Sequence, residues 1–421
     1  MKVWHVSPTN PTPEQLQDPA ATLQAGKLVA FPTETVYGLG ANALDEAAVR
    51  RIFRVKGRPA DNPLIVHIAS IEDLALVTPN PDAIPAAATR DMAAFWPGPL
   101  TIVLPASPRL APSVHPGMET VGVRMPAHPV AQMLIGLAGC PIAAPSANRS
   151  GRPSPTCAGD VAEDLADYLD AEEGVVDGGS CEVGVESTVI AVTDEEVVIY
   201  RPGGVSQEEL ERELGIPVRL DPHLQLDHVQ AHANSHLAPA QRIPDQSSDA
   251  TQAADLLEPE YQGQELQAPP SPGMKYRHYA PKATVIVWCG DSSRVREAMR
   301  QFALANVTNP IAIIGRTTWP SCPANAVCWT AAEAGGEAEA GAGGAAESEV
   351  ERDEHTLESK EAHESDEPYA ATLSRELYRL LRDFDRQGVT HILVEGVELE
   401  GLGLAVMNRL SKASEGRIFH V

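Results

Sequence analysis

The chain has 421 residues and a net charge of -26, from 58 acidic and 32 basic residues, and its length exceeds what one hydrophobic core usually organises. We therefore expect two domains with connecting sequence. The 36 prolines and 32 glycines disfavour a helical bundle, and the acidity disfavours a general nucleic-acid binder, because an acidic surface repels phosphates. No apolar run is long enough to span a membrane and no signal-peptide pattern begins the chain, so we expect a cytoplasmic protein without membrane contact.

The six cysteines include no CxxC pair; they lie at positions 140, 157, 181, 289, 322 and 328. Structural zinc sites and small disulfide frameworks depend on closely and regularly spaced cysteines. We therefore expect reduced, mostly buried thiols and no zinc.

Residues 1–217 contain a series of short apolar runs typical of β-strands. They lie at 27–33, 64–69, 100–105, 121–126, 141–146, 187–192 and 197–202. Helical patterns such as 45–57 separate only some of these runs. The arrangement predicts one α/β domain with a twisted, mixed sheet and helices.

The first domain is expected to end in a helix over 206–215. Ser206 and Glu209 have the spacing of a capping box, and Gly215 follows the last turn as a C-cap. Residues 218–282 then predict a linker, because the sequence becomes rich in His, Gln, Pro and Ser with little apolar periodicity.

Residues 283–421 predict a smaller, Rossmann-like α/β domain with parallel strands. Strand patterns alternate with helical ones, and the helix near 370–386 repeats its apolar residues with helical spacing. An insertion at 331–368 carries 13 acidic and two basic side chains. We expect this insertion to be disordered, because it buries too little apolar surface to offset its ordering entropy.

The stretch 31–68 is the first with a chemical pattern. A strand ends in a turn containing Thr33, Thr35 and Tyr37, and the following helix is rich in cations. These cations are Arg50, Arg51, Arg54, Lys56 and Arg58. Cations near a helix C-terminus can simply complement the helix dipole. Five neighbouring cations repel one another, however, so their density favours a polyphosphate ligand.

Further polar side chains lie at the ends of other predicted strands. They are Arg124, the pair Ser146 and Asn148, Ser187 with Thr188, and Arg201. Open α/β folds gather ligand-binding groups at strand ends. His67, in the apolar run 64–69, fits either a hydrogen-bonded core residue or a ligand contact.

Several common active-site motifs are absent from the sequence. It contains no GxxxxGK[ST] loop, no GxSxG elbow and no HExxH helix. The fragments GLGA at 38–41 and GLGLA at 401–405 are weak matches to a dinucleotide loop, so we expect neither a flavin nor a nicotinamide cofactor.

At this point the sequence resembles the YrdC-like family in its long, two-domain form. The residues that carry the resemblance are PTETVYGLG at 32–40, Lys56-Gly57-Arg58 followed by DNPL, Ser146-Ala147-Asn148, SPT at 154–156 and MKYRHYAPKA at 274–283. The resemblance implies a twisted sheet that encloses a positively charged cavity. It also implies synthesis of threonylcarbamoyl adenylate from L-threonine, bicarbonate and ATP with magnesium, for a tRNA modification completed by downstream threonylcarbamoyl-transfer machinery.

The resemblance also implies the site residues. Around the threonine it places Thr35, His67, Arg124, Ser146 and Ser187, and around ATP it places Lys56, Arg58, Asn62, Thr120, Asn148, Thr156, Arg201 and Tyr279. Lys56 and Arg58 are the implied catalytic residues, and no protein side chain is a direct metal ligand.

Two other functions stay open on the sequence alone. One is a carbamoyltransferase that handles carbamoyl adenylate, although the zinc-binding CxxC modules of such chains are absent here. The other is a non-catalytic RNA-binding module, which the overall acidity disfavours. We expect no stable tRNA binding.

Overall fold

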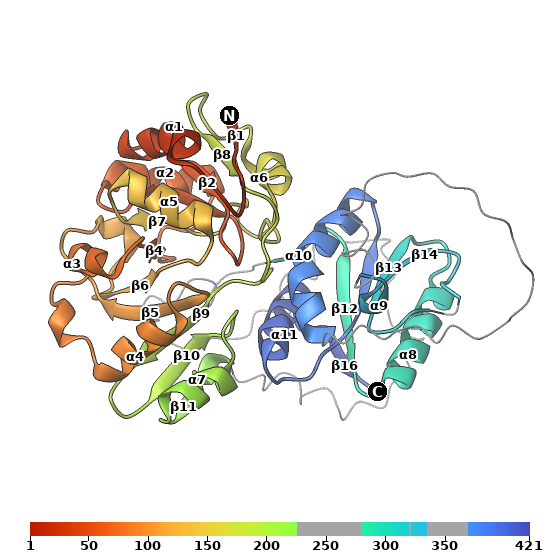
Figure 1. The fold of residues 1–421 in the computed structure, drawn as a ribbon. Helices are drawn as coiled ribbons and strands as arrows, with labels where there is room; N and C mark the ends of the chain where they lie inside the picture. The colour runs from red at the N-terminus through yellow and green to blue at the C-terminus, as the bar shows by residue number, and fades with distance from the viewer. Residues whose placement is uncertain (225–278, 320, 335–368) are drawn as a thin grey trace, which may run out of the picture.

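The computed structural model describes residues 1–224, 279–319, 321–334 and 369–421 as two α/β units (Figure 1). The first unit contains, in chain order, β1 (Lys2–His5), α1 (Pro13–Gln24), β2 (Val29–Phe31), β3 (Gly38–Asn42), α2 (Glu46–Lys56), β4 (Ile65–His67), α3 (Leu74–Val77), α4 (Ala86–Phe95), β5 (Leu100–Pro105), β6 (Thr120–Arg124), α5 (Pro129–Ala138), β7 (Ile142–Ala143), α6 (Ala158–Leu165), β8 (Gly174–Asp177), β9 (Thr188–Val192), β10 (Val197–Arg201), α7 (Gln207–Leu214) and β11 (Val218–Leu220). The second contains β12 (Thr284–Cys289), α8 (Ser292–Ala305), β13 (Ile311–Gly315), β14 (Ala326–Thr330), α9 (Ala331–Ala334), α10 (Tyr369–Arg386), β15 (His391–Glu395), α11 (Leu402–Ala413) and β16 (Ile418–His420).

The first unit is built on an 11-stranded sheet in the order β1-β8-β2-β3-β7-β4-β6-β5-β9-β10-β11. Parallel pairs such as β4 with β6 alternate with antiparallel pairs such as β5 with β6, which confirms the predicted mixed sheet. The sheet continues beyond residue 217, because β11 pairs in parallel with β10.

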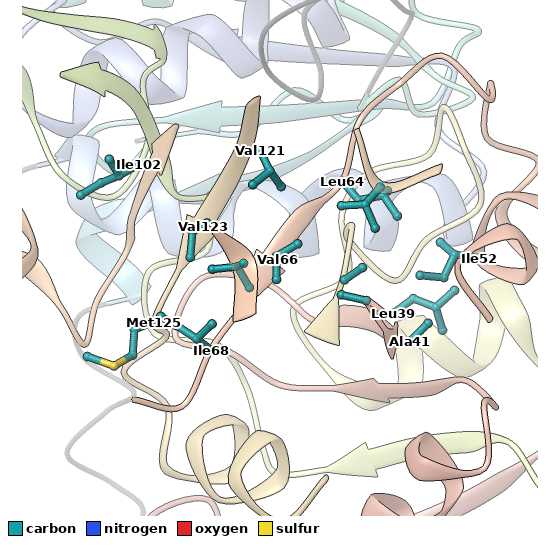
Figure 2. Close-up of a cluster of buried hydrophobic side chains, with 14 of the residues drawn as sticks. Leu39, Ala41, Ile52, Leu64, Val66, Ile68, Ile102, Val121, Val123 and Met125 are labelled. Carbon is teal, nitrogen blue, oxygen red and sulfur yellow. The ribbon is translucent and has the colours of Figure 1, made fainter. Parts of the chain in front are cut away.

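The core of the first unit lies between this sheet and its helices. Figure 2 shows buried side chains along β3, β4, β5 and β6, with Ile52 of α2 beside Leu39 and Ala41 of β3. The carboxylate of Asp45 caps α2 by accepting hydrogen bonds from the amides of Ala47 and Ala48. Gly57 ends the helix in the left-handed conformation, at φ 63°. Capping and core packing together fix the C-terminal end of α2, and with it the positions of Lys56 and Arg58.

The predicted helix over 206–215 corresponds to α7. Ser206 and Glu209 form the predicted capping box, and Gly215 adopts a φ of 64° at the C-cap. The predicted helix near 370–386 corresponds to α10, whose buried side chains include Leu373, Leu377 and Phe384. Both helices therefore follow their sequence signals.

The second unit has a five-stranded sheet in the order β14-β13-β15-β12-β16, and its strand pairs are parallel, as predicted. Alternate residues of β12 pack on opposite sides: Val285 and Val287 join a cluster with α10 and α11, whereas Ile286 and Trp288 pack with α8. Helices α10 and α11 cover the face turned toward the first unit (Figure 1). This face is where the two units make contact.

Several expectations fall wholly or partly on undescribed residues. Residues 225–278, most of the predicted linker, lie outside the described residues, as do residues 335–368 of the predicted insertion. The first four residues of that insertion form the helical turn α9.

The prediction that the cysteines are all reduced is wrong for one pair. Cys322 and Cys328 form a disulfide, with their Cα atoms 6.1 Å apart. The turn that leads into β14 brings the two residues together, which their lack of CxxC spacing did not indicate. Cys181 is a buried free thiol, and Cys140, Cys157 and Cys289 are half-buried.

Candidate active site

The candidate site is a cavity lined by residues at several strand ends of the first unit and by Tyr279. Nine of the predicted site residues line it: Thr35, Arg58, His67, Arg124, Ser146, Asn148, Ser187, Arg201 and Tyr279. The remaining wall is formed by Thr33, Val36, Gly38, Ile65, Ala144, Pro145 and Glu186. The cavity thus combines cationic and hydroxyl groups with apolar surface, as small-molecule sites commonly do.

Arg124 is the most firmly held cation in the cavity wall. It ends β6, directly beside His67 at the end of the parallel strand β4. Its guanidinium donates hydrogen bonds to Glu34 at 2.6 Å, to the Thr35 hydroxyl at 2.9 Å and to the carbonyl of Gly98 at 3.2 Å. A guanidinium has further N–H groups, so Arg124 can also bind an anionic ligand.

His67 is a neutral side chain in the cavity wall. Burial, and next the charge of Arg124, lower the pKa of His67 to about 3. Nδ1 of His67 is buried and has no hydrogen-bond partner in the described chain. A neutral imidazole that lines the cavity can donate a hydrogen bond to a ligand or accept one from it. This is compatible with the prediction that His67 contacts the ligand.

Ser187 and Arg201 form one polar wall of the cavity. The hydroxyl of Ser187 lies 2.7 Å from that of Thr101, and Arg201 donates to the Ser187 carbonyl at 2.8 Å and to its hydroxyl at 3.1 Å. Burial lowers the pKa of Arg201, but an arginine stays protonated in proteins. Arg201 therefore supplies a buried positive charge.

Lys56 supports the site from behind its wall. Its ammonium donates to the backbone carbonyls of Ser146 and Asn148, and the side chain is buried. Burial, and next the charge of Arg58, lower its pKa well below the usual range. Lys56 thus fixes the loop that carries two lining residues.

Arg58 lines the cavity itself and donates to the carbonyls of Asn62 at 3.2 Å and Pro63 at 2.8 Å. Two other members of the predicted cation cluster have carboxylate partners: Arg50 pairs with Glu46, and Arg51 pairs with Glu173 at 2.5 Å. The positive charges of Arg50 and Arg51 are therefore balanced by carboxylates of the chain itself. The density of cations predicted a polyphosphate ligand, but these two do not need a ligand for charge balance.

Four predicted site residues do not line the cavity: Lys56, Asn62, Thr120 and Thr156. Thr120 begins β6, at the opposite end of the strand from Arg124. Thr156 is buried, and its carbonyl accepts the amide of Cys181. Asn62 is buried, and both atoms of its amide lack a partner among the described residues.

Sequence reasoning missed two carboxylates at the site. Glu34 orients Arg124, and Glu186 lines the cavity and pairs with Arg409 of the second unit. A sequence signal for this pair does exist. Glu186 is the acid in the largely apolar stretch VGVESTV at 183–189, and Arg409 is the one arginine of the largely apolar helix α11. Charged residues in such stretches are rarely buried unless they are paired, so each indicates a partner in a buried ion pair.

The described residues contain neither a metal-ligand cluster nor a membrane-spanning helix. Within residues 1–224, 279–319, 321–334 and 369–421, no three His, Cys, Asp or Glu side chains gather in a way that could hold a metal ion. Over the same ranges, every helix is too short or too polar to cross a membrane.

Comparison with known proteins assigns both units. A family model described as telomere recombination matches residues 21–203, and one described as the C-terminal domain of threonylcarbamoyl-AMP synthase matches residues 246–415. The threonylcarbamoyl-AMP synthase of Pyrococcus abyssi is 41% identical over 404 residues, which are 96% of this chain and 94% of the relative. That of Bacillus subtilis is 38% identical over 422 residues, 99% of each protein.

A solved structure has the same fold. The crystal structure of P. abyssi Sua5 complexed with L-threonine has a TM-score of 0.75 and 38% sequence identity, and the match covers 100% of both chains. Two matched domains in the same order, together with relatives similar over nearly their full length, show that this chain belongs to the two-domain threonylcarbamoyl-AMP synthase family, whose first domain is YrdC-like.

Proposed function

We propose that this chain synthesises L-threonylcarbamoyl adenylate from L-threonine, bicarbonate and ATP, and releases pyrophosphate. Three arginines, Arg58, Arg124 and Arg201, converge on one cavity that also presents hydroxyl groups and a neutral imidazole. This convergence carries the proposal, because ATP is a polyanion and threonine presents a carboxylate. The full-length relatives named as synthases, and the relative solved with L-threonine, support it.

The threonine subsite is formed by Thr35, His67, Arg124, Ser146 and Ser187. Arg124 pairs with the threonine carboxylate, since a guanidinium that is already oriented by Glu34 loses little freedom on binding. His67 and the hydroxyl groups bind the amine and the side-chain hydroxyl. Apolar lining from Ile65 and Ala144 accommodates the methyl group.

Within the cavity wall, the nucleotide subsite is formed by Arg58, Asn148, Arg201 and Tyr279, with Lys56 behind it. The family resemblance adds Asn62, Thr120 and Thr156, which lie outside that wall. The amine of threonine attacks bicarbonate to give an N-carboxy species and water. A carboxylate oxygen of this species then attacks the α-phosphorus of ATP, and the bond to pyrophosphate breaks. Arg58 and Arg201 stabilise the charge that develops on the phosphates, while Lys56 keeps the loop of Ser146 and Asn148 in place.

The magnesium ion arrives with ATP as part of the substrate. Magnesium usually keeps several waters and binds substrate phosphates, so we expect the phosphates and water to supply most of its ligands. Transfer of the adenylyl group makes the enzyme a nucleotidyltransferase. The product then passes to downstream threonylcarbamoyl-transfer machinery, and a chain with a net charge of -26 binds no tRNA stably.

Pyrophosphate release by the purified chain tests the proposal. With magnesium-ATP and bicarbonate, we expect release that depends on L-threonine, and a threonylcarbamoyl adenylate product in the mass spectrum. Serine, which keeps the hydroxyl, replaces threonine better than valine does, because valine leaves buried polar groups unpaired. Release that is independent of threonine, or equal use of valine and threonine, contradicts the proposal.

A further inference from the structure

The cavity wall is tied to the second unit through the Glu186 carboxylate. Glu186 lines the cavity and is buried. Its carboxylate accepts hydrogen bonds from the Ser154 hydroxyl at 2.6 Å, from the Tyr378 hydroxyl at 3.0 Å and from Nε of Arg409 at 2.9 Å. Ser154 belongs to the first unit, whereas Tyr378 lies on α10 and Arg409 on α11. Two of these three donors therefore come from the second unit.

Arg409 binds two segments of the cavity wall, one at Glu186 and one at Pro202. While Nε binds Glu186, Nη1 donates to the carbonyl of Pro202 at 2.8 Å, directly after Arg201. The side chain of Arg409 is fully buried and lies 5.6 Å above the ring of Tyr279, which stacks on Tyr378. The wall of the cavity thus rests on a rigid cluster supplied by α10 and α11.

Charge explains why the Glu186 carboxylate needs these partners. The groups that face it are Arg201 on β10, Arg409 and Lys412 on α11, Tyr378 on α10, Tyr279 and Ser154. Burial alone raises the pKa of Glu186, but Arg409 and next Arg201 outweigh it and hold the pKa at about 2. The carboxylate is therefore ionised throughout the physiological range.

We propose that Arg409 and Tyr378 are positioning residues of the synthase site: they hold and neutralise Glu186, so that Arg201 stays available to the anionic substrates. This inference rests on the proposed function. Without Arg409, the cations that still face Glu186 are Arg201 and Lys412. A guanidinium–carboxylate pair is stronger than the bonds from Arg201 to the Ser187 carbonyl. Arg201 then turns away from the cavity, and a buried carboxylate repels ATP and the threonine carboxylate.

Steady-state kinetics on full-length variants test this inference. We expect Arg409→Gln to raise KM for ATP and threonine at least about tenfold, equivalent to about 1.4 kcal/mol, with a smaller effect on kcat. Arg409→Lys keeps the positive charge and recovers part of the loss. Tyr378→Phe keeps the stacked ring but loses one hydrogen bond to Glu186, so it raises KM about threefold.

Arg386→Gln is the matched control. Arg386 lies on α10, is partly exposed, and links the two units through Glu163 at 2.8 Å and through Asp160. It is not among the residues that line the cavity. We expect wild-type KM values for this variant. Equal KM values for Arg409→Gln and Arg386→Gln overturn the inference.

Removing the carboxylate provides a rescue test. In Arg409→Gln the buried Glu186 repels the substrates, so adding Glu186→Gln to the same chain should lower KM relative to Arg409→Gln alone. A merely structural role for Arg409 predicts the reverse, because the double variant loses more of the contact between units. A double variant as defective as the single one, or more so, contradicts the inference.

The pH profile gives an independent readout. Loss of Arg409 raises the pKa of Glu186, because burial is then opposed chiefly by Arg201. Protonation at lower pH removes the repelling charge, so the KM defect of Arg409→Gln relative to wild type should shrink as the pH falls. A defect that stays constant down to the lowest pH at which the chain remains folded speaks against the inference.

Calorimetric titration with L-threonine separates this inference from the proposed function. If the wild-type chain binds threonine but releases no pyrophosphate, the proposed function fails, and the threonine affinities of the variants still decide the positioning role. Wild-type chain that does not bind threonine overturns both. If Arg409→Gln fails to fold, Tyr378→Phe carries the comparison, and wild-type affinity in a folded Tyr378→Phe chain counts against the inference.

Discussion

Lys56 and Arg58 are separated by one glycine and have different surroundings. Gly57 adopts a φ of 63°, which turns the chain at the end of α2. Lys56 stays buried and binds backbone carbonyls, whereas Arg58 lines the cavity. The two cations therefore have distinct roles, one in holding the loop and one in contacting the ligand.

Substitution separates these roles. We expect Arg58→Ala to lower the turnover of threonine-dependent pyrophosphate release at least about tenfold with an unchanged melting temperature, because the lost charge faces the phosphates. Lys56→Ala should also lower turnover at least about tenfold. It should in addition cost about 2 kcal/mol of unfolding free energy, since it leaves buried carbonyls unpaired and opens a cavity.

Lys56→Met is the control, because it keeps most of the side-chain volume and removes only the ammonium group. Urea unfolding should give it a smaller loss of stability than Lys56→Ala. Wild-type turnover in either folded alanine variant contradicts the corresponding role.

Site residues whose position depends only on the nearby sequence could be predicted from the sequence. Arg124 and Arg201 end apolar strands and Ser187 directly precedes one, so the strand pattern alone placed them at strand ends. Thr120, which only the family resemblance placed in the site, begins the strand that Arg124 ends and does not line the cavity. Glu186 and Arg409 are 223 residues apart, and only the packing of the two units brings them together.

At the scale of elements, close approach of two backbone segments shapes the cavity wall. The loop after β10 passes directly over the segment that leads into β9. A Cβ at position 203 would lie 2.2 Å from the carbonyl oxygen of Glu186 and 2.4 Å from the carbonyl carbon of Ser187. Only glycine allows the two backbone segments to come this close. Their close contact keeps Arg201 beside the Ser187 carbonyl, to which it donates a hydrogen bond.

Gly203→Ala should therefore disturb the site directly. The added methyl group meets backbone atoms that cannot move independently, so the loop must shift, and we expect threonine affinity to fall at least about fivefold and stability to fall by about 2 kcal/mol. Gly136→Ala in α5 is the control, because its Cβ would come no closer than 3.9 Å to another residue. Calorimetry and urea unfolding measure both effects, and an unaltered Gly203→Ala chain contradicts this account.

Element type was more predictable than element partnership. The capping box at Ser206 and the leucine spacing in α10 are local signals, and both helices formed where these signals lie. The pairing of β1 with β8 joins residues 2–5 to 174–177, and no local pattern specifies it. Strand order is settled by packing across the whole sheet.

At the scale of the molecule, the two units share a buried ion pair. Arg382 of α10 is buried and donates to both carboxylate oxygens of Asp164 in α6, at 3.1 and 2.9 Å. Nearby, Gly184 lets the backbone of α10 approach closely, since a Cβ there would lie 2.3 Å from the Ser374 carbonyl oxygen. The contact between units is therefore specific in both charge and shape.

Arg382→Ala should destabilise the chain by about 3 kcal/mol. The substitution opens a cavity and leaves Asp164 buried with one cationic partner, Arg152. Urea unfolding of the full chain measures the loss. Arg386→Gln, which removes a partly exposed interaction between the same helices, should cost less than about 1 kcal/mol. Equal costs for the two variants contradict a specific role for the buried pair.

The distance in sequence between Glu186 and Arg409 also orders events during synthesis. The ribosome adds the 223 residues between them in roughly 10 to 45 s, at the usual rate of translation. Throughout that interval Glu186 of the nascent first unit lacks both of its donors from the second unit, Tyr378 and Arg409. Completion of α11 is thus the step at which a growing polypeptide first becomes able to assemble its own active site.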